Sequence, residues 1–123
     1  MQKLCREIRD RCPPVGGIAN GAMVLQDTLI RDLDTETLLK VLKPKVDGSR
    51  YLDEIFHDDK LEFCVFFSSL ASIYGNRGQS NYSAANAFMA ALAAQRRSRG
   101  QAASILHLGA VMGAGYGMCR SFS

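Results

Sequence analysis

Residues 63–92 read FCVFFSSLASIYGNRGQSNYSAANAFMAAL, and they decide the fold. The aromatic segment 62–68 carries no charge after its first residue and is too short for a typical helix, which predicts a strand buried on both faces. A helix is predicted from Ser80 to Arg99, because three arginines near its end suit the helix dipole and Gly100 follows as a C-cap. This stretch is therefore expected to form a buried strand followed by a helix.

The segments on either side repeat this alternation. An amphipathic helix is predicted at the N-terminus, ended by two prolines, and a short strand follows at residues 15–19. A long helix is expected over residues 34–56, with Asp34 as its N-cap and a kink or break near Pro44, and a last strand over residues 103–108. The order predicts an α/β fold: a partial doubly wound, Rossmann-like parallel sheet of about three strands with flanking helices.

Length and composition limit the number of domains and the classes of partner. A chain of 123 residues with 47% hydrophobic and 22% charged residues predicts one folded domain. The net charge is only +3, and its basic residues are spread along the chain except near residues 96–99, so no nucleic-acid partner is expected. The longest apolar run, residues 63–67, is far too short to cross a membrane, so no membrane partner is expected.

The N-terminus and the cysteines indicate the cellular setting. The first ten residues, MQKLCREIRD, carry charges throughout and lack the apolar core of a secretory signal. Four cysteines have no CxxC spacing and lie among apolar residues; they are Cys5, Cys12, Cys64 and Cys119. We therefore expect reduced thiols, a cytoplasmic location and no metal site.

A ligand site is predicted at one edge of the sheet, because open parallel sheets bind ligands beyond the carboxyl ends of their strands. Three segments converge on this edge: residues 20–23, 68–72 and 108–112. On the following helix, Tyr82 and Asn86 are four residues apart and project from the same face. Alone, such a pair is more often packing than chemistry.

Two further residues make the pair informative. Ser69 stands thirteen residues before Tyr82 at the end of the aromatic strand, and Lys45 stands twenty-four residues before Ser69 on the preceding helix. Each has an ordinary structural explanation, as a turn-capping serine or a solvated lysine. Ser68 is a rival for the catalytic place, although the spacing to Tyr82 favours Ser69.

In four segments the sequence resembles the ketoreductase domains of polyketide synthases, within the short-chain dehydrogenase/reductase superfamily. The matching segments are residues 16–29, 42–56, 63–92 and 96–113. The amino-acid sequences of these segments are most similar to those of fungal highly reducing synthases, especially synthases fused to a nonribosomal peptide synthetase. Free-standing reductases place a lysine four residues after the tyrosine, whereas these ketoreductases place asparagine there and keep the lysine on the earlier helix. The pairing of Asn86 with Lys45 follows the second pattern.

The resemblance implies NADPH-dependent reduction of a β-ketoacyl thioester, carried on an acyl carrier domain, to the β-hydroxyacyl product, with other synthase domains as partners. Tyr82 would donate the proton to the carbonyl oxygen, and Ser69 would hydrogen-bond the same oxygen. Lys45 would lower the pKa of Tyr82 from its usual value of about 10. Asn86 would hold an ordered water in a proton relay.

The resemblance also implies the cofactor contacts. They are Asn20, Gly21 and Ala22 on the adenine side of NADPH, and Leu108, Gly109 and Ala110 beside the nicotinamide. The configuration of the product hydroxyl is left open, because Tyr74 replaces the tryptophan that marks one stereochemical class and Gln26 with Asp27 keeps only part of the marker of the other.

The resemblance implies that a complete ketoreductase has a GxGxxG turn that binds the cofactor pyrophosphate, and this turn is not found in the sequence. The only glycine cluster, GAGYG at residues 113–117, has the wrong spacing for a phosphate-binding turn and follows the last strand. Residues 1–123 are therefore expected to be a partial ketoreductase domain, the catalytic half without its dinucleotide-binding strands, and inactive in isolation. The alternative is a truncated, non-catalytic remnant or a half-domain that associates with other protein. A free-standing reductase fragment is disfavoured by Asn86.

Overall fold

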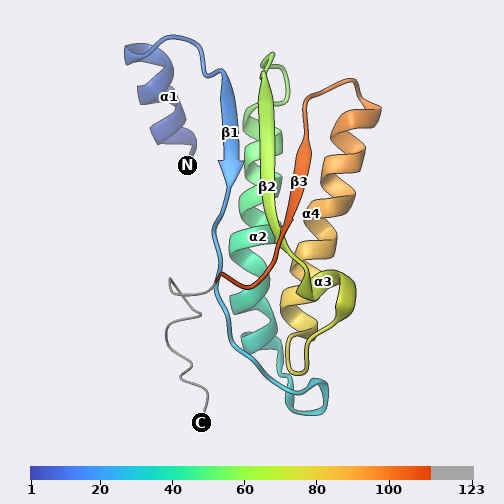
Figure 1. The fold of residues 1–123 in the computed structure, drawn as a ribbon. Helices are drawn as coiled ribbons and strands as arrows, with labels where there is room; N and C mark the ends of the chain where they lie inside the picture. The colour runs from blue at the N-terminus through green and yellow to red at the C-terminus, as the bar shows by residue number, and fades with distance from the viewer. Residues whose placement is uncertain (112–123) are drawn as a thin grey trace.

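The computed structural model describes residues 1–111 as a three-stranded parallel sheet backed by helices (Figure 1). Strand β1 (Gly17–Asn20) pairs with β2 (Phe63–Ser69), and β2 pairs with β3 (Ser104–Leu108). The strand order in the sheet is the order in the chain, β1-β2-β3. Right-handed crossovers in one direction place both connecting helices on the same face. The predicted α/β fold with three parallel strands is confirmed.

Helices fill the connections between the strands. Helix α2 (Thr35–Ile55) joins β1 to β2, α4 (Ser80–Ser98) joins β2 to β3, and both lie behind the sheet in Figure 1. Helix α1 (Gln2–Arg11) lies beyond the β1 edge. Two short helical turns, η1 (Ile30–Asp32) and α3 (Ala71–Tyr74), were not predicted, because neither is long enough to show a helical period.

Helix α2 is unbroken. Asp34 caps its N-terminus as predicted, because the carboxylate accepts a hydrogen bond of 2.7 Å from the backbone N–H of Thr37. The same hydrogen bond lowers the pKa of Asp34 below its usual value. The predicted break at Pro44 does not occur: the helix continues through the proline, since packing against β1 and α4 outweighs one missing backbone hydrogen bond.

The core lies between the sheet and the two helices. Its buried members are Cys5, Phe56, Leu61, Cys64, Phe66, Met89, Leu92 and Ala93. Strand β2 alternates, with Cys64 and Phe66 turned towards the helices and Phe63, which is 51% exposed, on the other face. The prediction that this strand is buried on both faces is therefore wrong for the described residues, since none of their helices covers the second face.

Helix α4 ends one residue earlier than predicted. Its last residue is Ser98, and Arg99 is the C-cap. Gly100 follows with a φ of 76°, a left-handed conformation that glycine adopts without a steric penalty. The glycine therefore ends the helix as expected, one position beyond the cap.

An ion pair joins the ends of α2 and α4. Asp53 on α2 accepts hydrogen bonds from Arg96 at 2.5 Å and from Arg99 at 2.6 Å. Arg96 is fully buried, and its Nε also donates to the carbonyl of Ala102 at 3.2 Å. The sequence suggested only a helix-dipole role for these arginines. In the structure, Arg96 also binds α2 through Asp53 and the segment before β3 through Ala102.

Candidate active site

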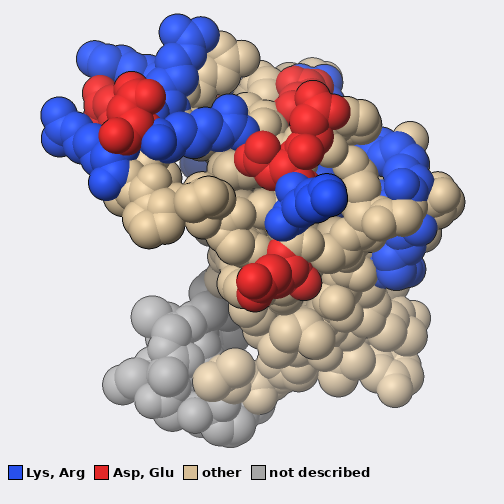
Figure 2. Space-filling model, turned by 90° about the horizontal axis from the view of Figure 1, so that it is seen from above, with Lys and Arg blue, Asp and Glu red and all other residues tan. Residues whose placement is uncertain are grey.

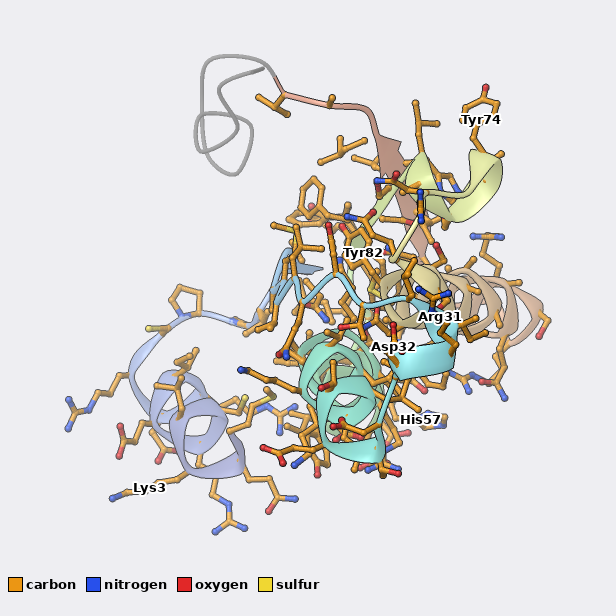
Figure 3. All side chains as sticks on the ribbon, turned by 90° about the horizontal axis from the view of Figure 1, so that it is seen from below. Lys3, Arg31, Asp32, His57, Tyr74 and Tyr82 are labelled. Atoms are coloured by element: carbon orange, nitrogen blue, oxygen red, sulfur yellow. The ribbon has the colours of Figure 1, made fainter. Side chains whose placement is uncertain are left out.

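The carboxyl ends of the three strands meet at the lower end of the molecule in Figure 1, where the segment after β1 crosses towards the start of α4. Figure 3 looks at this end and shows Tyr82 near the middle of the molecule and Tyr74 at its periphery. Tyr82 is buried, whereas Tyr74 is 81% exposed. The tyrosine that was predicted to be catalytic is therefore buried at the carboxyl ends of the strands, where the ligand site was predicted.

Both the backbone and the side-chain hydroxyl of Tyr82 are hydrogen-bonded. Its backbone N–H donates to the Asn81 side-chain oxygen at 2.7 Å, at the start of α4. Its hydroxyl donates to the Met23 sulfur at 3.4 Å. A thioether is a weak acceptor, so this contact orients the hydroxyl without committing its proton to a strong partner. Met23 lies within the predicted segment 20–23, but no sequence pattern singles it out.

Lys45 is buried against the tyrosine. Its side chain is only 2% exposed, and its Nζ lies 5.5 Å from the centroid of the Tyr82 ring. The Nζ donates a hydrogen bond of 2.7 Å to the carbonyl of Phe67 on β2. Burial lowers the pKa of Lys45 from 10.5 to about 8. Two polar but uncharged partners, a carbonyl and an aromatic face, thus hold a cation in the interior.

Asn86 leaves an acceptor open. The residue is fully buried one turn after Tyr82, and its Nδ2 donates to the Tyr82 carbonyl at 3.0 Å. Its Oδ1 is buried and has no hydrogen-bond partner among the described residues. Buried acceptors are almost always paired in folded proteins, so this atom is suited to receive a water or ligand donor.

The two serines lie on opposite faces of β2. Ser69 Oγ accepts a hydrogen bond of 3.1 Å from the N–H of Ala71, the first residue of α3. Ser68 is buried on the helix side, with its Oγ 3.4 Å from the Ser72 Oγ. The described contacts thus join Lys45 and Asn86 to Tyr82, while the contact of Ser69 runs to α3.

The residues predicted to bind the cofactor line the same edge. Gly21, Ala22, Leu108, Gly109 and Ala110 are exposed there. The backbone N–H of Leu70 donates to the Leu108 carbonyl at 2.9 Å and holds the end of β3 beside β2. A Cβ at Gly21 would lie 3.5 Å from the Phe67 ring, and one at Gly109 would lie 3.6 Å from Leu70.

These uncharged residues, small except for Leu108, could lie along the flat face of a nucleotide. The predicted exclusion of GAGYG as a phosphate turn concerns residues 113–117, which lie outside the described part of the chain. Asn20 differs from its neighbours, because it is buried and its side chain is hydrogen-bonded within the protein.

Two buried amides that the sequence did not reveal hold the loop over Tyr82. Asn81 Nδ2 donates to the Gln26 carbonyl at 3.1 Å, and Gln79 Nε2 donates to the Asp27 carboxylate at 3.0 Å. Both amides are buried just before Tyr82. No local pattern separates such tethering amides from solvated ones, because their partners lie on a distant segment.

Charged side chains gather at the opposite end of the molecule. Figure 2 views that end and shows basic side chains over α1 with acidic ones among them. Arg9 on α1 forms an ion pair with Asp59 at 2.7 Å. Within residues 1–111, no group of histidine, cysteine and carboxylate side chains is arranged to hold a metal ion, and no helix is long and apolar enough to cross a membrane.

Comparison with known sequences gives one consistent answer. The family model described as KR domain matches residues 1–113. A polyketide synthase-nonribosomal peptide synthetase from Aspergillus clavatus is 60% identical over 116 residues, which are 94% of this chain. A hybrid synthetase of the same kind from Xenoacremonium sinensis is 56% identical over 123 residues. The chain spans about 3% of the length of these curated relatives.

Solved structures agree with the sequence matches. The ketoreductase PlmKR1 from the first module of phoslactomycin biosynthesis in Streptomyces sp. HK803 superposes with a TM-score of 0.81 at 34% identity, over 87% of this chain and 25% of that one. A ketoreductase domain from the bacillaene assembly line gives 0.82 at 37% identity, over 88% and 27%. By fold, family model and fungal relatives, the chain belongs to the ketoreductase (KR) domain family, in the form found in fungal polyketide synthase-nonribosomal peptide synthetase hybrids.

Proposed function

We propose that this chain is the catalytic half of a ketoreductase domain in a larger cytoplasmic synthase. The domain reduces a β-ketoacyl thioester, presented by an acyl carrier domain, to the β-hydroxyacyl thioester with NADPH. The observation that carries the proposal is the buried Lys45 ammonium, 5.5 Å from the centre of the Tyr82 ring. Membership of the KR family supports the class of reaction.

Tyr82 is the proton donor in this proposal. Loss of the phenolic proton leaves a negatively charged phenolate, which a nearby cation stabilises. With a pKa of about 8, Lys45 still carries its proton at pH 7 and can provide this stabilisation. A substrate carbonyl oxygen is a stronger acceptor than the Met23 thioether and would replace it at the Tyr82 hydroxyl.

Ser69 and Asn86 complete the proposed set. The Ser69 oxygen accepts from a backbone N–H, so its own hydroxyl proton is available to the substrate carbonyl. The open acceptor of Asn86 supports a bound water that returns a proton towards Lys45 and Tyr82. Donors fixed around the oxygen lower the barrier because negative charge builds up on that atom.

NADPH, when bound, supplies the hydride for the carbonyl carbon. We propose that it lies along the exposed uncharged residues of the sheet edge, which are Gly21, Ala22, Leu108, Gly109 and Ala110. Asn20 would contribute through its backbone, since its side chain is hydrogen-bonded within the protein. The described residues do not include a glycine turn that could hold the pyrophosphate.

A chimaeric enzyme tests the proposal. Residues 1–111 of this chain replace the matching segment of the bacillaene ketoreductase domain, and NADPH consumption is followed with a β-ketoacyl thioester. Tyr82→Phe should lower kcat by roughly 10²- to 10⁴-fold, with NADPH affinity unchanged. Tyr51→Phe is the matched control on the exposed side of α2 and should leave kcat unchanged. A Tyr82→Phe chimaera as fast as its parent would refute the proton-donor assignment.

The exposed sheet face favours a second candidate, a half-domain that acts by associating with other protein. Phe63, Leu106 and Leu108 are all more than 40% exposed on β2 and β3. Faces of this kind usually become covered by protein. Tight binding of NADPH by the 123-residue chain alone would count against this second candidate, whereas association without NADPH binding would favour it.

A further inference from the structure

We propose that Asn20 is a positioning residue for Lys45. Its side-chain amide holds the turn of α2 from which Lys45 reaches Tyr82, and so fixes where the Lys45 ammonium lies. The importance of this position rests on the proposed function, because it assumes that Lys45 acts on Tyr82. The sequence had suggested only a cofactor contact for Asn20.

The Asn20 amide is used within the protein at both of its ends. Asn20 is the last residue of β1 and is buried. Its Nδ2 donates to the Ser49 Oγ at 2.8 Å and to the Pro44 carbonyl at 3.3 Å, and its Oδ1 accepts from the Ala22 N–H at 3.0 Å. One side chain therefore links the end of β1 to two points on α2 and to the loop that follows β1.

The two contact points on α2 lie on either side of Lys45, where the helix is intrinsically weak. Pro44 removes one backbone hydrogen bond from this turn, and Gly48 is among the least favourable residues for a helix interior. A Cβ at Gly48 would lie 3.5 Å from the Asn20 Nδ2, so the helix closely approaches the amide here. Hydrogen bonds from β1 to Pro44 and to the fully buried Ser49 stabilise a turn that propensity alone supports poorly.

The position of this turn sets the surroundings of the ammonium. Lys45 Nζ reaches over β2 to the Phe67 carbonyl, and from α4 it faces the Tyr82 phenol, the titratable group among these partners. From β1 it meets the neutral Asn20 only through the helix turn. Because burial is what lowers the pKa of Lys45, a displaced turn would let water reach the ammonium and raise that pKa.

The test measures the Lys45 pKa by NMR in the 123-residue chain, with the exposed Lys43 as an internal reference. Asn20→Ala should raise the Lys45 pKa by about one unit, and Ser49→Ala should raise it less because one of the two helix contacts remains. Ser83→Ala is the matched control, since it also removes a partly buried side-chain hydrogen bond, here to α3, without touching α2. This control should leave the Lys45 pKa unchanged.

Two outcomes would overturn the proposal. One is an unchanged Lys45 pKa in folded Asn20→Ala and Ser49→Ala chains; the other is an equal rise in the Ser83→Ala control, which would indicate general loosening. If Asn20→Ala does not fold, Ser49→Ala decides, because alanine is favoured over serine in a helix. The measurement needs neither NADPH nor substrate, so an inactive chimaera would refute the proposed function and leave this result standing.

Discussion

Helices α2 and α4 hold two buried cations, and among the residues that the structure describes only one of them is paired with a carboxylate. Arg96, near the end of α4, is fully buried and paired with Asp53. Lys45, in the middle of α2, is almost as buried but is held by a carbonyl and an aromatic ring. The ion pair of Arg96 joins α4 to α2 and serves a structural role. Lys45, by contrast, has a pKa near the physiological range and can respond to its surroundings.

The largest effect is expected from breaking the ion pair of Arg96 with Asp53. Asp53→Ala leaves the buried Arg96 and its neighbour Arg99 without their carboxylate, and should lower the free energy of unfolding by about 3–5 kcal/mol in urea titrations. Asp47→Ala on the same helix is the control, because its pair with Arg50 is exposed and should contribute less than about 1 kcal/mol. Equal losses in the two variants would contradict the distinction between the two kinds of pair.

Replacing Lys45, which has no carboxylate partner within residues 1–111, should raise the free energy of unfolding instead of lowering it. The folded pKa of Lys45 is about 8 and its ordinary value is 10.5, so the unfolded chain binds the proton more tightly between these values. Stability should therefore rise by about 3 kcal/mol as the pH rises from about 8 to 10.5, and this gain is lost again as the pH falls from 10.5 to about 8. Lys45→Met should be more stable than the parent at pH 7 and should abolish this rise.

The comparison with Lys45→Met also separates a second titration. Burial raises the pKa of the Cys64 thiol, so its ionisation lowers stability as pH rises above about 9. This effect is present in both chains and cancels in the difference between their urea midpoints. Parallel stability curves for the parent and Lys45→Met over the whole window would show that burial does not depress the Lys45 pKa.

The smallest change in stability is expected from Arg96→Lys, which tests whether the charge or the shape of the paired cation matters more. Arg96→Lys keeps the charge beside Asp53 but loses the second donor that reaches the Ala102 carbonyl. We expect a loss of about 1–2 kcal/mol in the free energy of unfolding, less than for Asp53→Ala because the charge stays paired. A loss as large as that of Asp53→Ala would mean that the shape of the guanidinium matters more than its charge.

The order of elements was predictable because it depends on local patterns. Strand β2 was predicted at residues 62–68 and is found at Phe63–Ser69, and the capping role of Asp34 was visible from its place before an apolar period. A kink or a break was predicted at Pro44, and the break is wrong because local rules do not include the packing of α2 or the Asn20 hydrogen bond to that turn.

The candidate site was predictable in composition more than in contacts. Spacing and resemblance singled out Tyr82, Asn86 and Lys45, and the structure places them together. The contact of Met23 with the Tyr82 hydroxyl could not be read from the sequence, because it joins segments far apart in the chain. The catalytic roles of Tyr82, Ser69, Lys45 and Asn86 and the cofactor contacts all stay predictions.

The tethers over Tyr82 have a consequence for how the protein folds. The hydrogen bonds of Gln79, Asn81 and Tyr82 to the loop after β1 span 52, 55 and 59 residues of sequence. Contacts of such long range form only after the entropy of closing a large loop has been overcome. Helices can form early from local contacts, so the end of this domain that holds the candidate site assembles late, after β1 and α4 have come together.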